Sequence, residues 1–275
     1  MFTIIPNFLR DPNGFFQSIS HGEEIGEKIR ALAISSILFL AIYGFVTGLS
    51  HSFLQAISSA TKMPVLFVAT VFFCLPAFYF FSLVLGTKLT LAQVTAVMLS
   101  AVGVTAFLLL GLSPITLFFV LTSENFAFFR LLLTAFVALA GFVGVHFLWR
   151  GISSVETSDD VSYKQLRRLL LGMWFALYGF IGSQMAWRLS PFVGDSKNPF
   201  ELLRPTRDNF YVDVIKAFVE VAGLQISLIN VNAVLVGAGC LIPLIALVFI
   251  IGTAKDASKK NKPASQNLAT PQANA

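Results

Sequence analysis

Residues 182–223 read GSQMAWRLSPFVGDSKNPFELLRPTRDNFYVDVIKAFVEVAG and form the only long polar interruption in an otherwise apolar chain. The segments on either side are about 20 residues long, the length that a helix needs to cross the hydrocarbon core of a bilayer. Apolar residues make up 56% of the 275 positions and charged residues 12%, against roughly 45–50% and about 25% in soluble domains. The sequence therefore predicts an all-α fold, a polytopic bundle of transmembrane helices.

Six apolar segments are predicted to span the membrane within a transmembrane domain that covers residues 31–252. Their ranges are 31–50, 64–85, 91–112, 129–149, 169–187 and 231–251. Pro76 and Pro243 lie inside the second and sixth segments, and each is a candidate helix kink because proline has no backbone N–H to donate. Residues 113–123 are apolar but too short to span, so they are re-entrant, interfacial or the end of a bent third helix.

Three shorter segments have the mixed composition of helices that lie in a membrane surface. Residues 1–30 form an N-terminal interfacial segment with a turn at residues 11–14, or alternatively a mobile tail. Residues 51–62 are predicted to form a short surface helix. In residues 188–223, a polar loop leads into an amphipathic helix. Its apolar face carries Tyr211, Val214, Ile215, Phe218 and Val221, and its charged face carries Asp213, Lys216 and Glu220. Residues 253–275 contain few apolar side chains and are predicted to be a disordered tail.

The distribution of basic residues predicts that both termini are cytoplasmic. With six spans the termini share one side, and more Lys and Arg residues then fall on the inside than on the outside. The loop in residues 188–223 is then extracytoplasmic. The net charge of +5 does not indicate nucleic acid as a partner, because the basic residues sit at helix ends. An integral protein of the bacterial inner membrane is the location that we expect.

The sequence contains no recognisable catalytic motif. GxSxG, HExxH, CxxC and phosphate-binding glycine loops are missing, and the three histidines are too scattered for a metal site. We therefore expect neither an enzyme nor a cofactor, although an enzyme would remain an alternative if His51, Glu124 and Arg188 clustered at one face.

The residues of the loop suggest a scaffold or interaction partner in the membrane. Prolines stiffen the path of residues 188–223, and basic side chains stand among aromatic anchors. The candidate contacts for a partner or a lipid headgroup are Trp187, Arg188, Lys197, Arg204, Arg207 and Lys216. The expected partners are membrane lipids, other membrane proteins or a second copy of the chain. Alternatively, the loop is a lid that only packs over the helix ends.

The alternative function is a transporter or channel for a small or lipidic solute. Pro76 and Pro243 would then bend pore-lining helices, and the water-filled cavity would be lined by Asn230, Asn232, Ser183 or Gln184. No Asp, Glu, Lys or Arg lies near the centre of a predicted span, which argues against ion-coupled transport.

Two short sequences in the first and fifth predicted spans resemble each other. Residues 41–46 read AIYGFV and residues 176–181 read ALYGFI. If they belong to an internal repeat, the two helices cross the membrane in the same direction.

The first half of the chain also resembles a known family. A Pro12-x-x-Phe15-Phe16-x-x-Ile19 opening precedes the first span, the spans are closely spaced, and Ser113-Pro114 follows the third. These features resemble the Yip1-like membrane family, in particular its uncharacterised bacterial polytopic members. The Asp-Leu-Tyr-Gly-Pro signature of the eukaryotic trafficking members is missing. The resemblance implies a non-enzymatic membrane protein with several helices.

Overall fold

The computed structural model describes residues 8, 10–84, 89–123, 125–155, 161–193, 200, 202–203 and 210–221. Regular structure in these residues is helical, as the element bounds show: α2 (Pro12–Ser20), α3 (Ile25–Gly48), α4 (Phe53–Val84), α5 (Leu91–Thr122), α6 (Phe126–Val155), α7 (Val161–Leu189) and α8 (Phe210–Val221). Five of them, α3 to α7, are long and apolar enough to cross a membrane. The prediction of an all-α transmembrane bundle is confirmed. The sixth predicted span, Pro243 and the predicted disordered tail lie outside the described residues.

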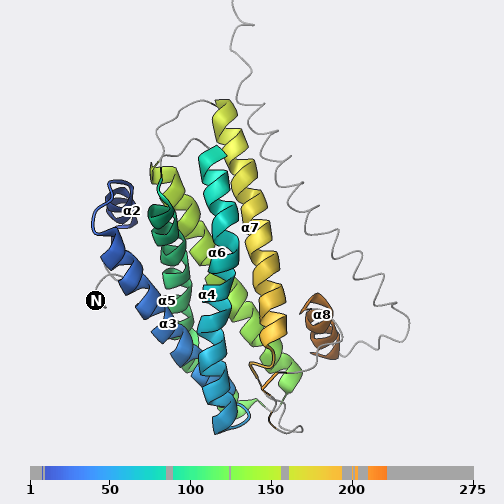
Figure 1. Ribbon diagram of the computed structural model, residues 1–275. Coiled ribbons are helices and arrows are strands. Elements are labelled where there is room, and N and C mark those ends of the chain that lie inside the picture. The colour runs from blue at the N-terminus through green and yellow to red at the C-terminus, as the bar shows by residue number, and fades with distance from the viewer. Residues whose placement is uncertain are drawn as a thin grey trace, which may run out of the picture.

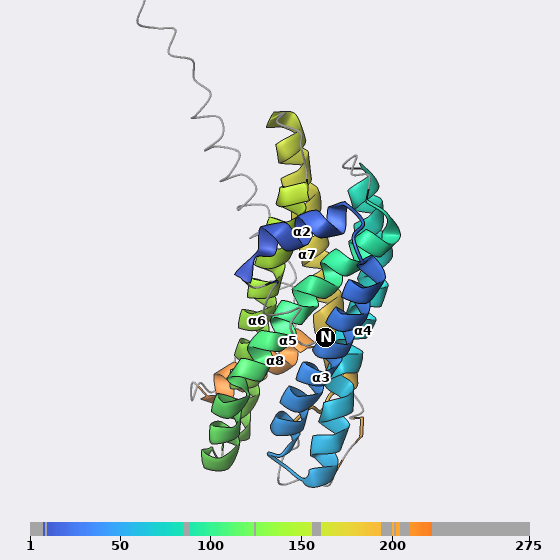
Figure 2. The same ribbon diagram turned by 90° about the vertical axis from the view of Figure 1, so that its left-hand side faces the viewer.

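The five long helices run up and down beside one another (Figure 1). Helix α3 packs against α4 and α5, α5 packs against α6, and α4 packs against α7. The α3–α4 connection, the α5–α6 connection and the end of α7 therefore share one end of the bundle, which we call the loop end (Figures 1 and 2). The other end carries α2 and the start of α3. The grouping of the connections agrees with the predicted topology, while the side that faces the cytoplasm stays a prediction.

Helices α3 and α4 approach closely because glycines line their contact. A Cβ atom on Gly44 would lie 2.4 Å from the carbonyl oxygen of Ser59, and one on Gly48 would lie 2.5 Å from that of Gln55. Small residues four positions apart allow two membrane helices to bring their backbones together. This contact fixes the position of the first turns of α4.

Two predicted segments prove to be parts of longer helices. Residues 53–62 are not a separate surface helix but the first turns of α4, which continues through both Pro64 and Pro76. Residues 113–122 form the end of α5, so the third of the three readings of that segment is correct. An apolar environment explains the continuity: breaking a helix there exposes several backbone groups without water, whereas one proline removes a single hydrogen bond.

Helix α2 lies across the bundle at the end opposite the loop end (Figure 2). The predicted turn at residues 11–14 is wrong, because Asp11 caps the helix by accepting a 3.1 Å hydrogen bond from the Gly14 N–H. Phe16 and Ile19 are fully buried, and the Gln93 side chain of α5 donates to the carbonyl of Ile19 over 2.9 Å. A mobile tail is therefore also wrong for residues 12–20, whose apolar side chains pack on the protein.

The two similar hexapeptides lie in helices of the same direction but in different surroundings. Helices α3 and α7 both run toward the loop end (Figure 1). Gly44 contacts α4 closely, whereas a Cβ atom on Gly179 would meet nothing within 4 Å. The two glycines are thus not equivalent in packing, and the internal repeat stays a prediction.

Candidate functional site

A buried polar face occupies the first turns of α4. Gln55, Ser59 and Lys62 are spaced so that they share one side of a helix. Gln55 and Ser59 are fully buried, and Lys62 is only 7% exposed. The neighbouring apolar face is turned outward, with Phe53 67% and Ile57 50% exposed. This orientation is the reverse of the one expected for a surface helix.

These three polar side chains hold the backbone that follows α7. Gln55 donates to the Pro191 carbonyl over 2.8 Å, and Ser59 donates to the Phe192 carbonyl over 2.6 Å. The Lys62 ammonium donates to the Pro191 carbonyl over 3.0 Å and also to the Leu202 carbonyl. We call Gln55, Ser59 and Lys62 the α4 clamp. It holds Pro191, Phe192 and Leu202 against the first turns of α4.

The clamp is energetically substantial because its donors and acceptors are buried. Hydrogen bonds that involve a charged group contribute about 1.5–3 kcal/mol, and a buried polar group left without a partner costs about 1–3 kcal/mol. Burial removes water from the Lys62 ammonium, and the dipoles of the two carbonyls replace part of that hydration. Removal of Lys62 would also deprive the Pro191 and Leu202 carbonyls of a donor. The position of the loop therefore depends on a few α4 side chains.

The predicted contact residues only partly fall in the described structure. Trp187 is half-buried and Arg188 is exposed at the end of α7, and Lys216 is exposed on α8. Lys197, Arg204 and Arg207 lie outside the described residues. Sequence reasoning missed the α4 clamp, although the spacing of Gln55, Ser59 and Lys62 was visible. A surface helix over residues 51–62, as predicted, would place these polar side chains in water.

Helix α8 packs against α6 and α7. Tyr211 forms a 3.1 Å hydroxyl–hydroxyl hydrogen bond with Ser183 of α7. Val212 and Ala217 are buried, while Phe218 is 61% and Val221 42% exposed. The predicted amphipathic helix is therefore present, and part of its predicted apolar face is not covered by the described residues.

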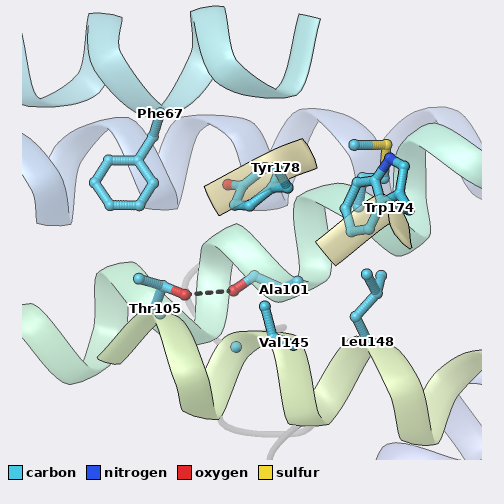
Figure 3. Close-up of a pocket in the computed structure, with 10 residues that line it drawn as sticks. Phe67, Ala101, Thr105, Val145, Leu148, Trp174 and Tyr178 are labelled. Atoms are coloured by element: carbon cyan, nitrogen blue, oxygen red, sulfur yellow. Dashed lines mark hydrogen bonds between the residues drawn. The ribbon is translucent and has the colours of Figure 1, made fainter. Parts of the chain in front are cut away.

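The interior of the bundle contains one small cavity where α4, α5, α6 and α7 meet (Figure 3). Its volume is about 30 Å³, which is enough for roughly one water molecule. Apolar side chains such as Phe67, Leu148 and Trp174 surround most of it. Thr105 lies at its edge, and its hydroxyl donates to the Ala101 carbonyl over 2.9 Å.

A second hollow, about 320 Å³, lies between α5 and α6 and is lined by apolar residues such as Phe107, Leu112 and Leu139. Ser183 and Gln184, which were predicted to line a polar cavity, line neither of these two hollows. Asn230 and Asn232 lie outside the described residues.

Acidic, histidine and cysteine side chains do not gather into a metal-binding group of three or more in the part of the chain that the structure describes. His51 follows α3 and Arg188 lies in the last turn of α7, both at the loop end, while Glu124 is outside the described residues. Comparison of the chain with protein-family models, with curated proteins and with solved structures finds no match.

Proposed function

We propose that this protein is a non-catalytic scaffold in the membrane and that it binds another membrane protein through the loop end. The binding platform consists of the end of α7, the segment that follows it and α8. The observation that carries the proposal is the α4 clamp, in which Gln55, Ser59 and Lys62 hold the backbone of that segment.

Fixed backbone positions at Pro191, Phe192 and Leu202 favour binding, because the entropy of ordering those residues is already lost before the partner arrives. Residues 188–221 carry five basic and five acidic side chains, so the platform has no net charge. Arg188 and Lys216 are exposed on it. We therefore propose a partner that pairs with these two charges at the level of the headgroups.

The apolar lining of the two hollows described above supports a scaffold over a transporter of polar solutes. The cavity among α4, α5, α6 and α7 has a volume of about 30 Å³, and the hollow between α5 and α6 has one of about 320 Å³. A solute pathway needs a polar cavity that reaches the middle of the membrane. We also propose that the chain is related to the Yip1-like family, and the resemblance to that family implies a non-enzymatic protein.

We further propose a bacterial inner-membrane location with the loop end outside. Cysteines substituted at Lys216 and at the exposed Glu23 would report the two ends of the bundle, in a variant without Cys74 and Cys240. A membrane-impermeant maleimide added to spheroplasts is expected to label position 216 and to spare position 23. Labelling of position 23 alone would show the opposite orientation.

Photo-cross-linking in native membranes tests the scaffold itself. A photoreactive amino acid at Arg188 is expected to capture a discrete protein, identified by mass spectrometry. The same amino acid at Phe142, which is 73% exposed on α6, serves as a control for random contact within the membrane.

Charge reversal provides the second arm of this experiment. Arg188→Glu combined with Lys216→Glu is expected to abolish recovery of the protein captured from another platform position, such as Phe200. If recovery and membrane assembly are both unchanged by the reversal, a protein partner that pairs with Arg188 and Lys216 is wrong.

A further inference from the structure

The segment after α7 exposes large apolar side chains beside the α4 clamp. Leu202 is 60% exposed and Leu203 is 55% exposed, although the backbone of Leu202 is bonded to Lys62. On α8, Phe218 and Val221 are spaced by three residues and share a face, with 61% and 42% exposure. Neighbouring apolar side chains that are this exposed usually mark a contact with a membrane or a partner.

Contacts of α8 with α7 indicate the depth of this surface. Trp187 and Arg188 have the composition that marks the membrane interface at a helix end. The hydroxyl of Tyr211, at the start of α8, is bonded to Ser183, which lies five residues before Arg188 and so about 7.5 Å back along α7 from it. The Tyr211 hydroxyl therefore lies on the hydrocarbon side of the interfacial residues.

The contact of Leu202 with α4 indicates a similar depth. Helix α4 has 32 residues, so at 1.5 Å per residue it is about 48 Å long and exceeds a hydrocarbon core of roughly 30 Å. Lys62, which holds Leu202, lies about 14 Å along the helix from its first residue, Phe53. The Leu202 carbonyl is therefore bonded to a residue that lies more than two turns into α4 from its first residue.

The chemistry of the clamp fits this depth. Non-helical backbone within a bilayer must find hydrogen-bond partners in the protein, because lipid offers none. The carbonyls of Pro191, Phe192 and Leu202 are non-helical, and each accepts a hydrogen bond from the α4 clamp.

We infer that Leu202, Leu203, Phe218 and Val221 insert into the acyl-chain region of the leaflet at the loop end, with Lys62 holding the loop at that depth. The occupant of this surface is lipid. Both parts of this surface lie against candidate spans, since α8 packs against α6 and α7 and Leu202 is bonded to α4. The inference does not depend on the proposed protein partner, which would bind the charged side of the same segment.

Spin labels on the full chain in nanodiscs of phosphatidylcholine and phosphatidylglycerol test the insertion. Single cysteines replace Leu203, Phe218 or Lys216 in a variant with Cys74→Ala and Cys240→Ala. Labels at 203 and 218 are expected to collide more with oxygen, which is concentrated in lipid, than with a water-soluble nickel chelate. The label at 216, on the charged face of α8, is expected to show the opposite preference and serves as the matched control.

Lys62→Met tests the role of the clamp in the same assay. The label at 203 is expected to become several-fold more accessible to the nickel chelate, whereas the label at 218 changes little because Tyr211 still binds Ser183. If Lys62→Met does not fold, Ser59→Ala removes one clamp bond with less disturbance and is expected to shift the label at 203 in the same direction.

Two results would overturn the inference. Labels at 203 and 218 that are both readily reached by the nickel chelate in the unaltered chain would put this surface in water. Labels that neither reagent reaches would mean that protein covers it. Either result leaves the cross-linking test of the scaffold unaffected, so the two proposals can fail separately.

Discussion

Residues 12–20 and residues 53–62 are two amphipathic stretches that the fold uses in opposite ways. In α2, the apolar side is turned toward the protein, and Phe16 and Ile19 are fully buried. In the first turns of α4, the apolar side is turned outward, and Phe53 is 67% exposed while Lys62 is buried. Helix α2 therefore contacts the protein through its apolar side, whereas the start of α4 contacts it through its polar side.

The difference follows from what lies opposite each stretch. Helix α2 covers apolar parts of α5 and α6, where Phe8, just before the helix, meets Phe147 with their ring centroids 5.6 Å apart. The start of α4 faces the carbonyls of the segment after α7. Hydrophobic periodicity indicates that two faces of a helix differ, and in a membrane protein it does not say which face meets the protein.

The largest effect is expected from truncating the buried aromatic side chain of α2. Phe16→Ala should weaken the attachment of α2 by about 3–5 kcal/mol, the usual cost for a buried phenylalanine. Phe53→Ala is the matched change in α4 and should cost little, because that ring already faces outward. Limited proteolysis near residue 10 and thermal unfolding in detergent measure the two variants. Equal costs would contradict the opposite orientations.

Removal of buried charge is expected to have the next largest effect, this time in α4. Lys62→Met should destabilise the loop end by about 1.5–3 kcal/mol, because it removes the charged donor from the buried Pro191 carbonyl and the partly buried Leu202 carbonyl. Lys28 offers a matched control near α2: it donates to the Ser18 hydroxyl and the Glu23 carbonyl at partly exposed positions. Lys28→Met should cost less because water can replace the lysine. Hydrogen exchange of residues 190–193 reports the loop directly, and unchanged exchange in Lys62→Met would contradict the clamp.

The sequence was sufficient to predict the class of fold but not the orientation of its short segments. Span-length apolar runs indicate membrane helices almost by themselves, and five of the six predicted runs lie in helices of the structure. The α4 clamp depends on contacts between residues more than 125 positions apart, such as Lys62 with Pro191. A local pattern carries no information about that distant carbonyl. The second span was predicted to begin at Pro64 because proline is favourable in the first turn of a helix, but proline is also tolerated inside a membrane helix.

The two similar hexapeptides allow a sharper test of what positions the clamp. Gly44→Ala would bring a methyl group against the Ser59 carbonyl oxygen, and overpacking of this kind costs about 1–3 kcal/mol. The displaced α4 backbone should also weaken the bond from Ser59 to the loop. Gly179→Ala is the matched control, because the added Cβ would meet no atom within 4 Å, and it should be neutral. Equal thermal stabilities for both variants in detergent would contradict the close α3–α4 contact.

The smallest effects are expected from the caps that begin the two amphipathic stretches. Asp11 accepts from the Gly14 N–H over 3.1 Å, and Ser52 accepts from the Gln55 N–H over 3.2 Å. Loss of such a cap costs about 0.5–2 kcal/mol. Asp11→Ala should be the more visible change, because α2 has only 9 residues to compensate, whereas the 32-residue α4 is held by α3 and the bilayer.

Hydrogen exchange of residues 12–20 and 53–62 measures both cap variants in one experiment. Faster exchange is expected throughout α2 in Asp11→Ala and only near residues 53–56 in Ser52→Ala. If hydrogen exchange in residues 190–193 also becomes faster in Ser52→Ala, the cap helps to orient the first turn of α4 so that Gln55 can bond to the loop. The orientation of the polar face would then depend on the entry of α4 as well as on its distant partners.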